Sequence, residues 1–153
     1  MEYAEGSLGR VFAARFRDGE PVYAGIEEIA RREGISSAVV LAVGGARRGG
    51  VVCGPKDAEG PVEPMVAGFD DARELLAVGT IHPDDDGPAL HLHAGLGRAG
   101  EEPIVGCPRE GLDAYLVLEV FVIEVTGLNA ARKLDPASGL KLLAFEGARI
   151  VEL

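Results

Sequence analysis

Several residue types are scarce or missing in this 153-residue chain, and each absence narrows what the protein can be. It has only two cysteines, Cys53 and Cys107, far apart in the sequence, so a disulfide framework is not expected. No apolar run approaches the roughly 20 residues that a membrane-spanning helix needs, and the first five residues lack the features of a signal peptide. We therefore expect a cytoplasmic protein with reduced thiols and no membrane partner.

An excess of positive charge is also missing. The 15 Lys and Arg residues are outnumbered by 25 Asp and Glu residues, which gives a formal net charge of −10. This is the wrong sign for a broad surface that neutralises phosphates, so binding to DNA by the chain alone is disfavoured. A small basic patch around Arg47 and Arg48, or one created by subunit symmetry, is still compatible with this charge. Tryptophan and glutamine are absent, and the depletion of amides leans towards a thermophile.

What the chain does contain is enough apolar material for one folded domain. Hydrophobic residues make up 47% of the sequence and charged residues 26%, with no low-complexity tract. The length suits one domain with its own core and is too short for two ordinary ones. We expect a single domain over residues 1–153.

The clearest predicted element is a helix over residues 22–33, where Val22, Ile26, Ile29 and Ala30 recur at helical spacing and Gly34 is placed to end it. Alternation and β-branched content predict strands elsewhere, with a tight turn at Gly44-Gly45 and a proline-rich loop over residues 54–64. The predicted strands are residues 9–16, 36–46, 47–53, 65–69, 74–81, 88–97, 115–125, 140–145 and 148–153. No βαβ alternation is present, so the pattern predicts an α+β fold with a mainly antiparallel sheet and one principal helix.

The segment 115–125 differs from the other predicted strands because nine of its eleven residues are apolar. A strand of this kind is expected to have both faces covered. Glu119 would then be a carboxylate among hydrophobic side chains, and such a group must be paired, hydrogen-bonded, liganded or protonated. A salt bridge to one of the arginines and a role in function are both open.

All three histidines fall between residues 82 and 93. Successive side chains of a strand point to opposite faces, so His91 and His93 share one face while Leu90 and Leu92 share the other. Two adjacent imidazoles are suited to chelate zinc or a similar metal. The alternative is a histidine pair that faces solvent or a subunit partner. His82 lies in an acidic turn and is only a doubtful addition to the site.

Cys107 is the third candidate ligand. A glycine-rich hairpin over residues 97–102 would return the chain beside the histidine strand and bring Cys107 near His91 and His93. Two imidazoles and a thiolate make a zinc shell with an open fourth position. The alternative is a buried free cysteine with no ligand role.

Two other motif matches are weaker. Residues 95–100 fit the dinucleotide fingerprint G-x-G-x-x-G, but the nearby prolines leave no room for the helix on which that fingerprint depends, so a hairpin is expected. The His-x-His pair is also similar to the cupins, although Glu101 lies too far away and no later histidine follows. This second similarity supports an alternative function, a metal-dependent enzyme for a small molecule in which Glu119 acts as general base.

Taken in order, several short motifs resemble the PPC domain, the plant and prokaryote conserved domain. They are Arg10-Val-Phe, Gly34-Ile35, the segment 42–46, Gly79-Thr-Ile, the segment 91–97, Val105-Gly-Cys107 and Glu119-Val120. The resemblance implies a compact α+β domain that forms trimers, in a family whose prokaryotic members are usually labelled DNA-binding. The AT-hook of the plant proteins is absent here.

Many members of that family have Gly-Gly-His where this chain has Val105-Gly106-Cys107. The resemblance therefore implies either that Cys107 replaces a histidine ligand or that the third ligand is lost. The function that it implies is a homotrimeric zinc-binding module with a binding or regulatory role. Any association with DNA would then use local or partner-assisted contacts.

Overall fold

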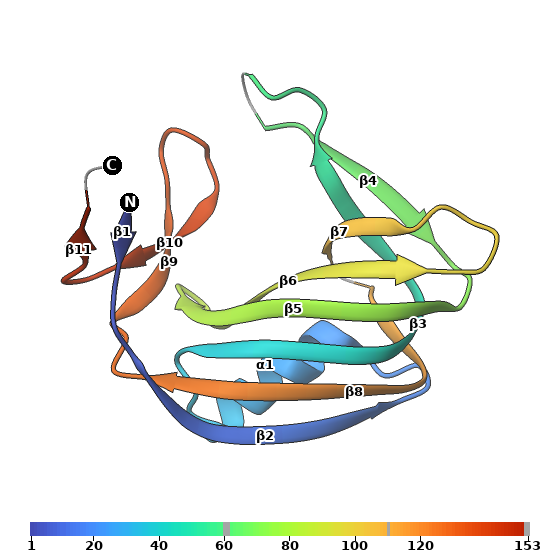
Figure 1. Ribbon diagram of the computed structural model, residues 1–153, viewed down its shortest axis with the longest axis horizontal. Helices are drawn as coiled ribbons and strands as arrows, with labels where there is room; N and C mark the ends of the chain where they lie inside the picture. Colours follow the sequence, from blue (N-terminus) through green and yellow to red (C-terminus); the bar gives the residue numbers. More distant parts are fainter. Residues whose placement is uncertain (60–61, 110, 152–153) are drawn as a thin grey trace.

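The structure is a computed structural model that describes residues 1–59, 62–109 and 111–151 (Figure 1). Over these ranges the chain forms one helix and eleven strands. In chain order they are β1 (Glu2–Tyr3), β2 (Ser7–Arg17), α1 (Val22–Glu33), β3 (Ala38–Pro55), β4 (Pro64–Phe69), β5 (Arg73–Asp84), β6 (Gly87–Gly97), β7 (Ile104–Pro108), β8 (Asp113–Thr126), β9 (Ala130–Leu134), β10 (Lys141–Phe145) and β11 (Arg149–Ile150).

Seven strands form the main sheet, in the order β2-β8-β3-β5-β6-β7, with β4 paired to the second half of β3. Every pairing is antiparallel, and β7 also pairs back onto β3. The remaining strands make two small two-stranded sheets, β9 with β10 and β1 with β11. The predicted α+β fold with a mainly antiparallel sheet and one principal helix is confirmed.

Helix α1 begins and ends as predicted from the sequence. Gly34 adopts the left-handed conformation at φ 66°, and its backbone N–H bonds to the carbonyls of Ala30 and Arg31. A glycine reaches this conformation without the steric cost that a Cβ would impose. Val22, Ile26 and Ala30 are buried on the side that packs against the sheet, so the core lies between the helix and one face of the sheet (Figure 1).

The two faces of the sheet differ in exposure. On the face toward the helix, Leu118, Val120 and Val122 of β8 are fully buried. On the opposite face, here called the outer face, β8 leaves Val117 42% and Phe121 40% exposed. The prediction that both faces of this strand are covered is therefore wrong for the single chain, since nothing in the described chain covers the middle of the outer face.

The turn predicted at Gly44-Gly45 is not present, because β3 runs without a break through both glycines. A Cβ on Gly44 would collide with the carbonyl oxygen of Val117, and one on Gly45 would lie 2.6 Å from that of Tyr115. The register of β3 against β8 shifts between these glycines, as in a β-bulge. The two glycines thus allow close approach of two strands rather than a reversal of the chain.

Two hairpins project from the main sheet. One is the outer part of β3 with β4, here called the β3–β4 arm, which rises at the right of Figure 1. The other is the β9–β10 hairpin, at the left, whose first strand lies against β5. Strand β9 was not predicted, and the predicted strand 148–153 is observed as β11, with residues 152–153 outside the described residues. No helix in the described ranges is long and apolar enough to cross a membrane.

Candidate metal centre

Strand β6 places both histidines on the outer face. Leu90, Leu92 and their inward neighbours are buried, while His91 and His93 are exposed between them. The two Nε2 atoms lie 3.2 Å apart, and the rings meet edge to face at 5.0 Å between centroids. The alternation predicted from the sequence thus brings two imidazole nitrogens to one point.

Strand β7 brings Cys107 to the same point. Ala94 pairs with Gly106, and continuing this antiparallel register by one residue sets Cys107 opposite His93. The thiol is buried, and the ligand atoms of His91, His93 and Cys107 all lie within 4.8 Å of one another. The predicted hairpin between β6 and β7 is present, and the G-x-G-x-x-G match falls on it rather than on a helix N-terminus.

The spacing of these three donors fits a single zinc ion. With Zn–N of about 2.0–2.1 Å and Zn–S of about 2.3 Å, the donors of a tetrahedral site lie roughly 3.3–3.7 Å apart. The two histidine nitrogens are already 3.2 Å apart. All three ligand atoms lie within 4.8 Å of one another, so a small adjustment of the side chains would bring them to the spacing of a tetrahedral site. Three protein donors would leave one coordination position for another ligand.

The surroundings of the first imidazole favour the form that binds metal. Although His91 is exposed, partial desolvation of its ring lowers its pKa, and the charges of Arg132, His93 and Arg109 lower it further. A neutral imidazole has a free lone pair, whereas an imidazolium has none to offer. Behind the site, the Tyr23 hydroxyl of α1 donates a 2.6 Å hydrogen bond to the carbonyl of Pro108, which ties the helix to the residue after Cys107.

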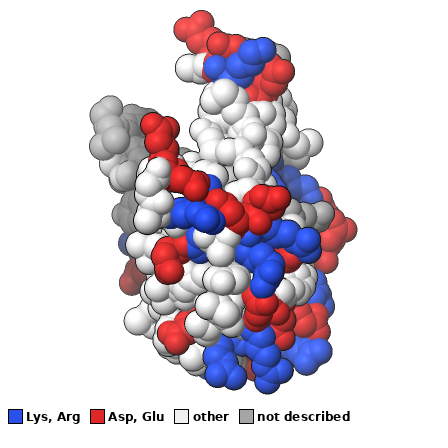
Figure 2. Space-filling model, turned by 90° about the vertical axis from the view of Figure 1, so that its right-hand side faces the viewer, with Lys and Arg blue, Asp and Glu red and all other residues white. Residues whose placement is uncertain are grey.

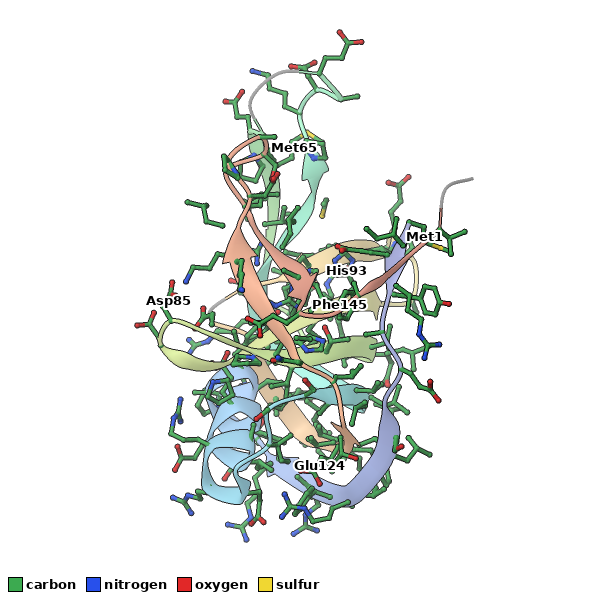
Figure 3. The ribbon with its side chains drawn as sticks, turned by 90° about the vertical axis from the view of Figure 1, so that its left-hand side faces the viewer. Met1, Met65, Asp85, His93, Glu124 and Phe145 are labelled. Atoms are coloured by element: carbon green, nitrogen blue, oxygen red, sulfur yellow. The ribbon has the colours of Figure 1, made fainter. Side chains whose placement is uncertain are left out.

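The three donors face open space. A cavity of about 430 Å³ is lined by His91, His93, Cys107 and Arg109 together with Leu140 and the β3–β4 arm. A second cavity, of about 510 Å³, shares His91, Arg109 and Leu140 with the first and extends under the β9–β10 hairpin. In Figure 3 this hairpin, which ends at the labelled Phe145, passes in front of the strand that carries His93. The centre therefore opens onto a cleft between the two hairpins.

Glu119 is not near this centre. It is exposed on the outer face, and the register links it through Val43 and Leu76 to Gly95 of β6. Three strand spacings of about 4.8 Å separate β8 from β6, so roughly 14 Å lies between Glu119 and the histidine strand. The structure thus brings three of the four sequence-predicted residues together and leaves Glu119 apart.

His82 is also outside the donor set. It is 5% exposed, and its Nδ1 lies 3.1 Å from the Ser37 hydroxyl. Burial and the nearby charge of Arg132 lower its pKa, and the residue packs into the protein away from the donor set. Three residues of the site were missed from the sequence: Tyr23, Arg109 and Arg132. The position of Arg109 two residues after Cys107 was a usable signal, whereas nothing local marks the other two.

Fold and centre together define a small α+β domain that gathers two histidines and a cysteine in a cleft between hairpins. The chain belongs to the Plants and Prokaryotes Conserved (PCC) domain family, whose model matches residues 3–126. The resemblance seen in the sequence is confirmed. A search of curated proteins gives no match.

Solved structures of similar fold come from archaea and bacteria. A metal-containing protein from Archaeoglobus fulgidus is 28% identical with a TM-score of 0.83, over 94% of this chain and 99% of that one. A PPC protein from Pyrococcus horikoshii is 25% identical with a TM-score of 0.82, over 98% and 100% of the two chains. A candidate DNA-binding protein from Ralstonia eutropha, 20% identical with a TM-score of 0.71, covers 88% and 90% and shows the fold alone.

Proposed function

We propose that this protein is a homotrimeric zinc-binding module that binds a small ligand at its metal centre and so has a binding or regulatory role. The observation that carries the proposal is the set of three donor atoms within 4.8 Å of one another on the wall of an open cavity. The metal-containing relative from Archaeoglobus fulgidus supports it, at 28% identity over nearly the whole chain.

Metal analysis of the purified protein tests the centre. Protein without a histidine tag is expected to carry one zinc per chain, and the double variant His91→Ala, His93→Ala is expected to lose it. His82→Gln is the matched control, because this histidine is buried outside the donor set. Equal metal content in the wild type and the double variant would discard the zinc centre.

A ligand-binding role has better support than the enzyme alternative. That alternative needs a general base close to the metal, and Glu119, the residue expected to serve, is three strands away. A ligand site and an enzyme site both require an open coordination position that faces a cavity. Ligand binding needs no general base, so the described centre already has the groups that it requires.

The trimer is proposed from the outer face of the sheet. Leu41, Val43, Leu76, Val78 and Phe121 are each 40–70% exposed there, on neighbouring strands of one register. A continuous apolar surface of this kind is typical of a subunit interface. Light scattering at micromolar concentration is expected to give three times the chain mass of 16.0 kDa, and a monomer mass would contradict the trimer.

We propose that a single chain does not bind DNA, and that any contact requires the trimer or a partner. The two arginines expected to form a basic patch are each paired, Arg47 with Asp18 at 2.5 Å and Arg48 with Asp113 at 2.6 Å. Figure 2 shows basic and acidic side chains intermixed on the face that it presents. Salt-dependent binding of the purified protein to duplex DNA tests this, and no binding at low salt would remove direct DNA contact by the trimer.

A further inference from the structure

The cavity beside the metal centre gathers positive charge in a protein of net charge −10. Its lining includes three cationic side chains, Arg109, Arg132 and Lys141, and one carboxylate, Asp84. Lys141 is already paired, with Asp84 at 3.2 Å and Asp85 at 3.1 Å. For neither arginine does a carboxylate of the described residues lie within ion-pair distance, 4.0 Å. As far as the described residues are concerned, the two guanidinium groups can therefore bind a ligand.

Arg132 is held in this position without an ion pair among the described residues, although the nearby carboxylate of Asp84 partly compensates its charge. One Nη donates a 3.0 Å hydrogen bond to the Thr80 hydroxyl, a neutral partner, and its buried Nε has no acceptor among the described residues. Burial lowers the pKa of Arg132, and the nearby Cys107 and Asp84 offset this only in part. A partly desolvated cation whose hydrogen-bond partner is neutral costs free energy, and a bound anion would recover part of that cost.

Apart from His91 and Asp84, whose carboxylate pairs with Lys141, the remaining wall of the cavity is apolar. Leu90, Leu140, Leu142 and Leu143 line it, three of them from the β9–β10 hairpin and the turn that precedes β10. A volume of about 510 Å³ accommodates a small organic molecule rather than a polymer. The cavity thus combines two guanidinium donors with a surface suited to a short hydrocarbon chain.

We propose that this cavity binds a small organic anion, with its carboxylate or phosphate group on Arg132 and Arg109 and its hydrocarbon part against the leucines. Guanidinium groups bind such oxyanions through paired, charge-assisted hydrogen bonds. His91 borders both cavities, so the same anion can reach the open position of the metal. This last step rests on the proposed zinc centre, where an ion held by one thiolate and two neutral imidazoles remains positively charged.

The experiment titrates metal-free protein, dialysed free of chelator, with three probes followed by ligand-observed NMR. Butyrate is expected to bind about tenfold more tightly than butyramide, which has the same shape and no charge. Arg132→Gln is expected to weaken butyrate binding by about tenfold, and Arg31→Gln, on the exposed surface of α1, to leave it unchanged. Inorganic phosphate is the third probe, and Arg132-dependent binding tighter than that of butyrate would assign a phosphate group to the ligand.

Equal affinity for butyrate and butyramide would overturn the proposal. Unchanged butyrate binding in folded Arg132→Gln and Arg109→Gln protein would overturn it as well. Arg109→Gln keeps the test decisive if the other variant fails to fold, which circular dichroism would reveal. Because the titration uses metal-free protein, it fails or succeeds independently of the zinc centre. Repeating it with zinc-loaded protein is expected to tighten butyrate binding, and no tightening would overturn the step in which the anion reaches the metal.

Discussion

Among individual residues, Cys107 is the donor most firmly placed by the fold. It is 5% exposed, whereas both histidines are exposed, and it lies on a strand paired on both sides. Its thiolate is also the one negatively charged donor of the proposed centre, beside two arginines that would otherwise repel a cation. The metal affinity should therefore depend strongly on this residue.

Loss of a residue that only hydrogen-bonds to a metal ligand typically lowers metal affinity by roughly 10–100-fold. Cys107→Ser removes a ligand itself, so we expect it to lower the zinc affinity by at least this factor. A serine hydroxyl does not ionise at neutral pH and is a poor zinc ligand. Competition with a chromophoric chelator measures the change. Cys53→Ser is the matched control, since Cys53 is an exposed cysteine outside the donor set. Equal affinities of the wild type and Cys107→Ser would remove Cys107 from the shell.

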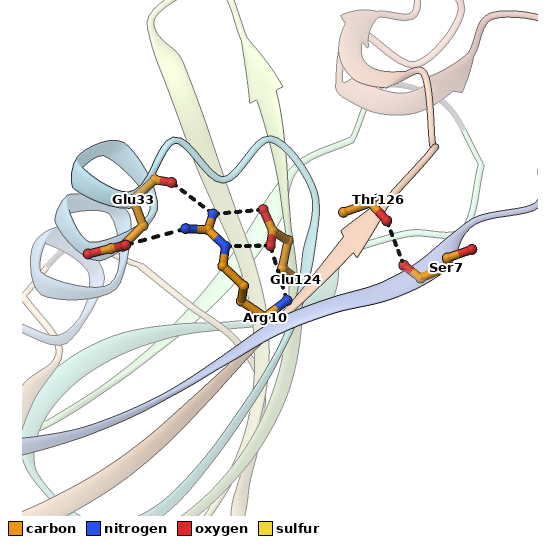
Figure 4. A network of polar contacts seen from close by, with 5 residues as sticks. All are labelled: Ser7, Arg10, Glu33, Glu124 and Thr126. Atoms are coloured by element: carbon orange, nitrogen blue, oxygen red, sulfur yellow. Dashed lines mark hydrogen bonds and ion pairs between the residues drawn. The ribbon is translucent and has the colours of Figure 1, made fainter.

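Glu124 makes the fold sensitive to acid. Its carboxylate accepts hydrogen bonds from the Arg10 side chain at 2.8 and 2.9 Å and from the Arg10 backbone N–H at 3.1 Å, while Arg10 also reaches Glu33 of α1 (Figure 4). These bonds lower the pKa of Glu124 to about 2. A lowered folded-state pKa means that this stabilisation is complete above the ordinary value of 4.5 and is lost as the pH falls towards 2.

Glu124→Gln is expected to be less stable than the wild type at pH 7 and to lose less stability between pH 4.5 and pH 2. Urea unfolding at several pH values measures both effects. Glu59→Gln, in the exposed loop after β3, is the control and should leave the pH dependence unchanged. An identical pH profile in Glu124→Gln and the wild type would show that the contact with Arg10 contributes nothing to acid stability.

The metal centre also depends on how closely β7 approaches β3. A Cβ on Gly106 would collide with the carbonyl oxygen of Val52, so only glycine allows the pairing that fixes Cys107. Gly106→Ala is expected to lower the free energy of unfolding by about 1–3 kcal/mol, as overpacking does, and to weaken zinc binding with it. Gly97→Ala is the control at the end of β6, where a Cβ meets nothing within 4 Å. Chemical unfolding and the chelator competition test both effects, and unchanged stability in Gly106→Ala would contradict the steric argument.

The elements that the sequence predicted well are those determined by local signals. Helix α1 was predicted at its true bounds because its apolar spacing and Gly34 act within a few residues. Strand β3 was predicted as two because Gly44 and Gly45 have the composition of a turn, and only the close approach of β8 explains them. Strand β9 was missed because its short basic sequence has no alternation, and contact with β5 defines its place.

The same distinction explains the site. Alternation along β6 is a local property, so the shared face of His91 and His93 could be predicted. The glycine-rich hairpin predicted that the next strand runs back beside β6 and places Cys107 near the histidines. Arg132 comes from a hairpin that follows the main sheet in sequence and reaches the site only through tertiary packing. Glu119 lies on the same face of the sheet as the histidines, which is compatible with the alternation along its strand. The order of the strands could not be predicted from the sequence, and it places Glu119 three strands away from the histidines.

At the level of the whole molecule, the apolar outer face is exposed in a single chain, and we expect another protein surface to bury it. Leu76 is 70% exposed and lies on β5, between the exposed Val43 of β3 and the β6 strand that carries the histidines. In the proposed trimer this side chain would be buried against another copy of the sheet. A carboxylate at the same position would have to lose its hydration without a partner, which is costly.

Leu76→Glu is therefore expected to convert the trimer to monomers, and light scattering at micromolar concentration measures the change in mass. Leu134→Glu is the matched control, because Leu134 is 66% exposed on β9, outside the main sheet. The variant should remain folded by circular dichroism, since Leu76 contributes little to the core of the single chain. If Leu76→Glu stays trimeric, the outer face is not the interface. If it becomes monomeric and keeps its zinc, each chain holds its metal without help from its neighbours.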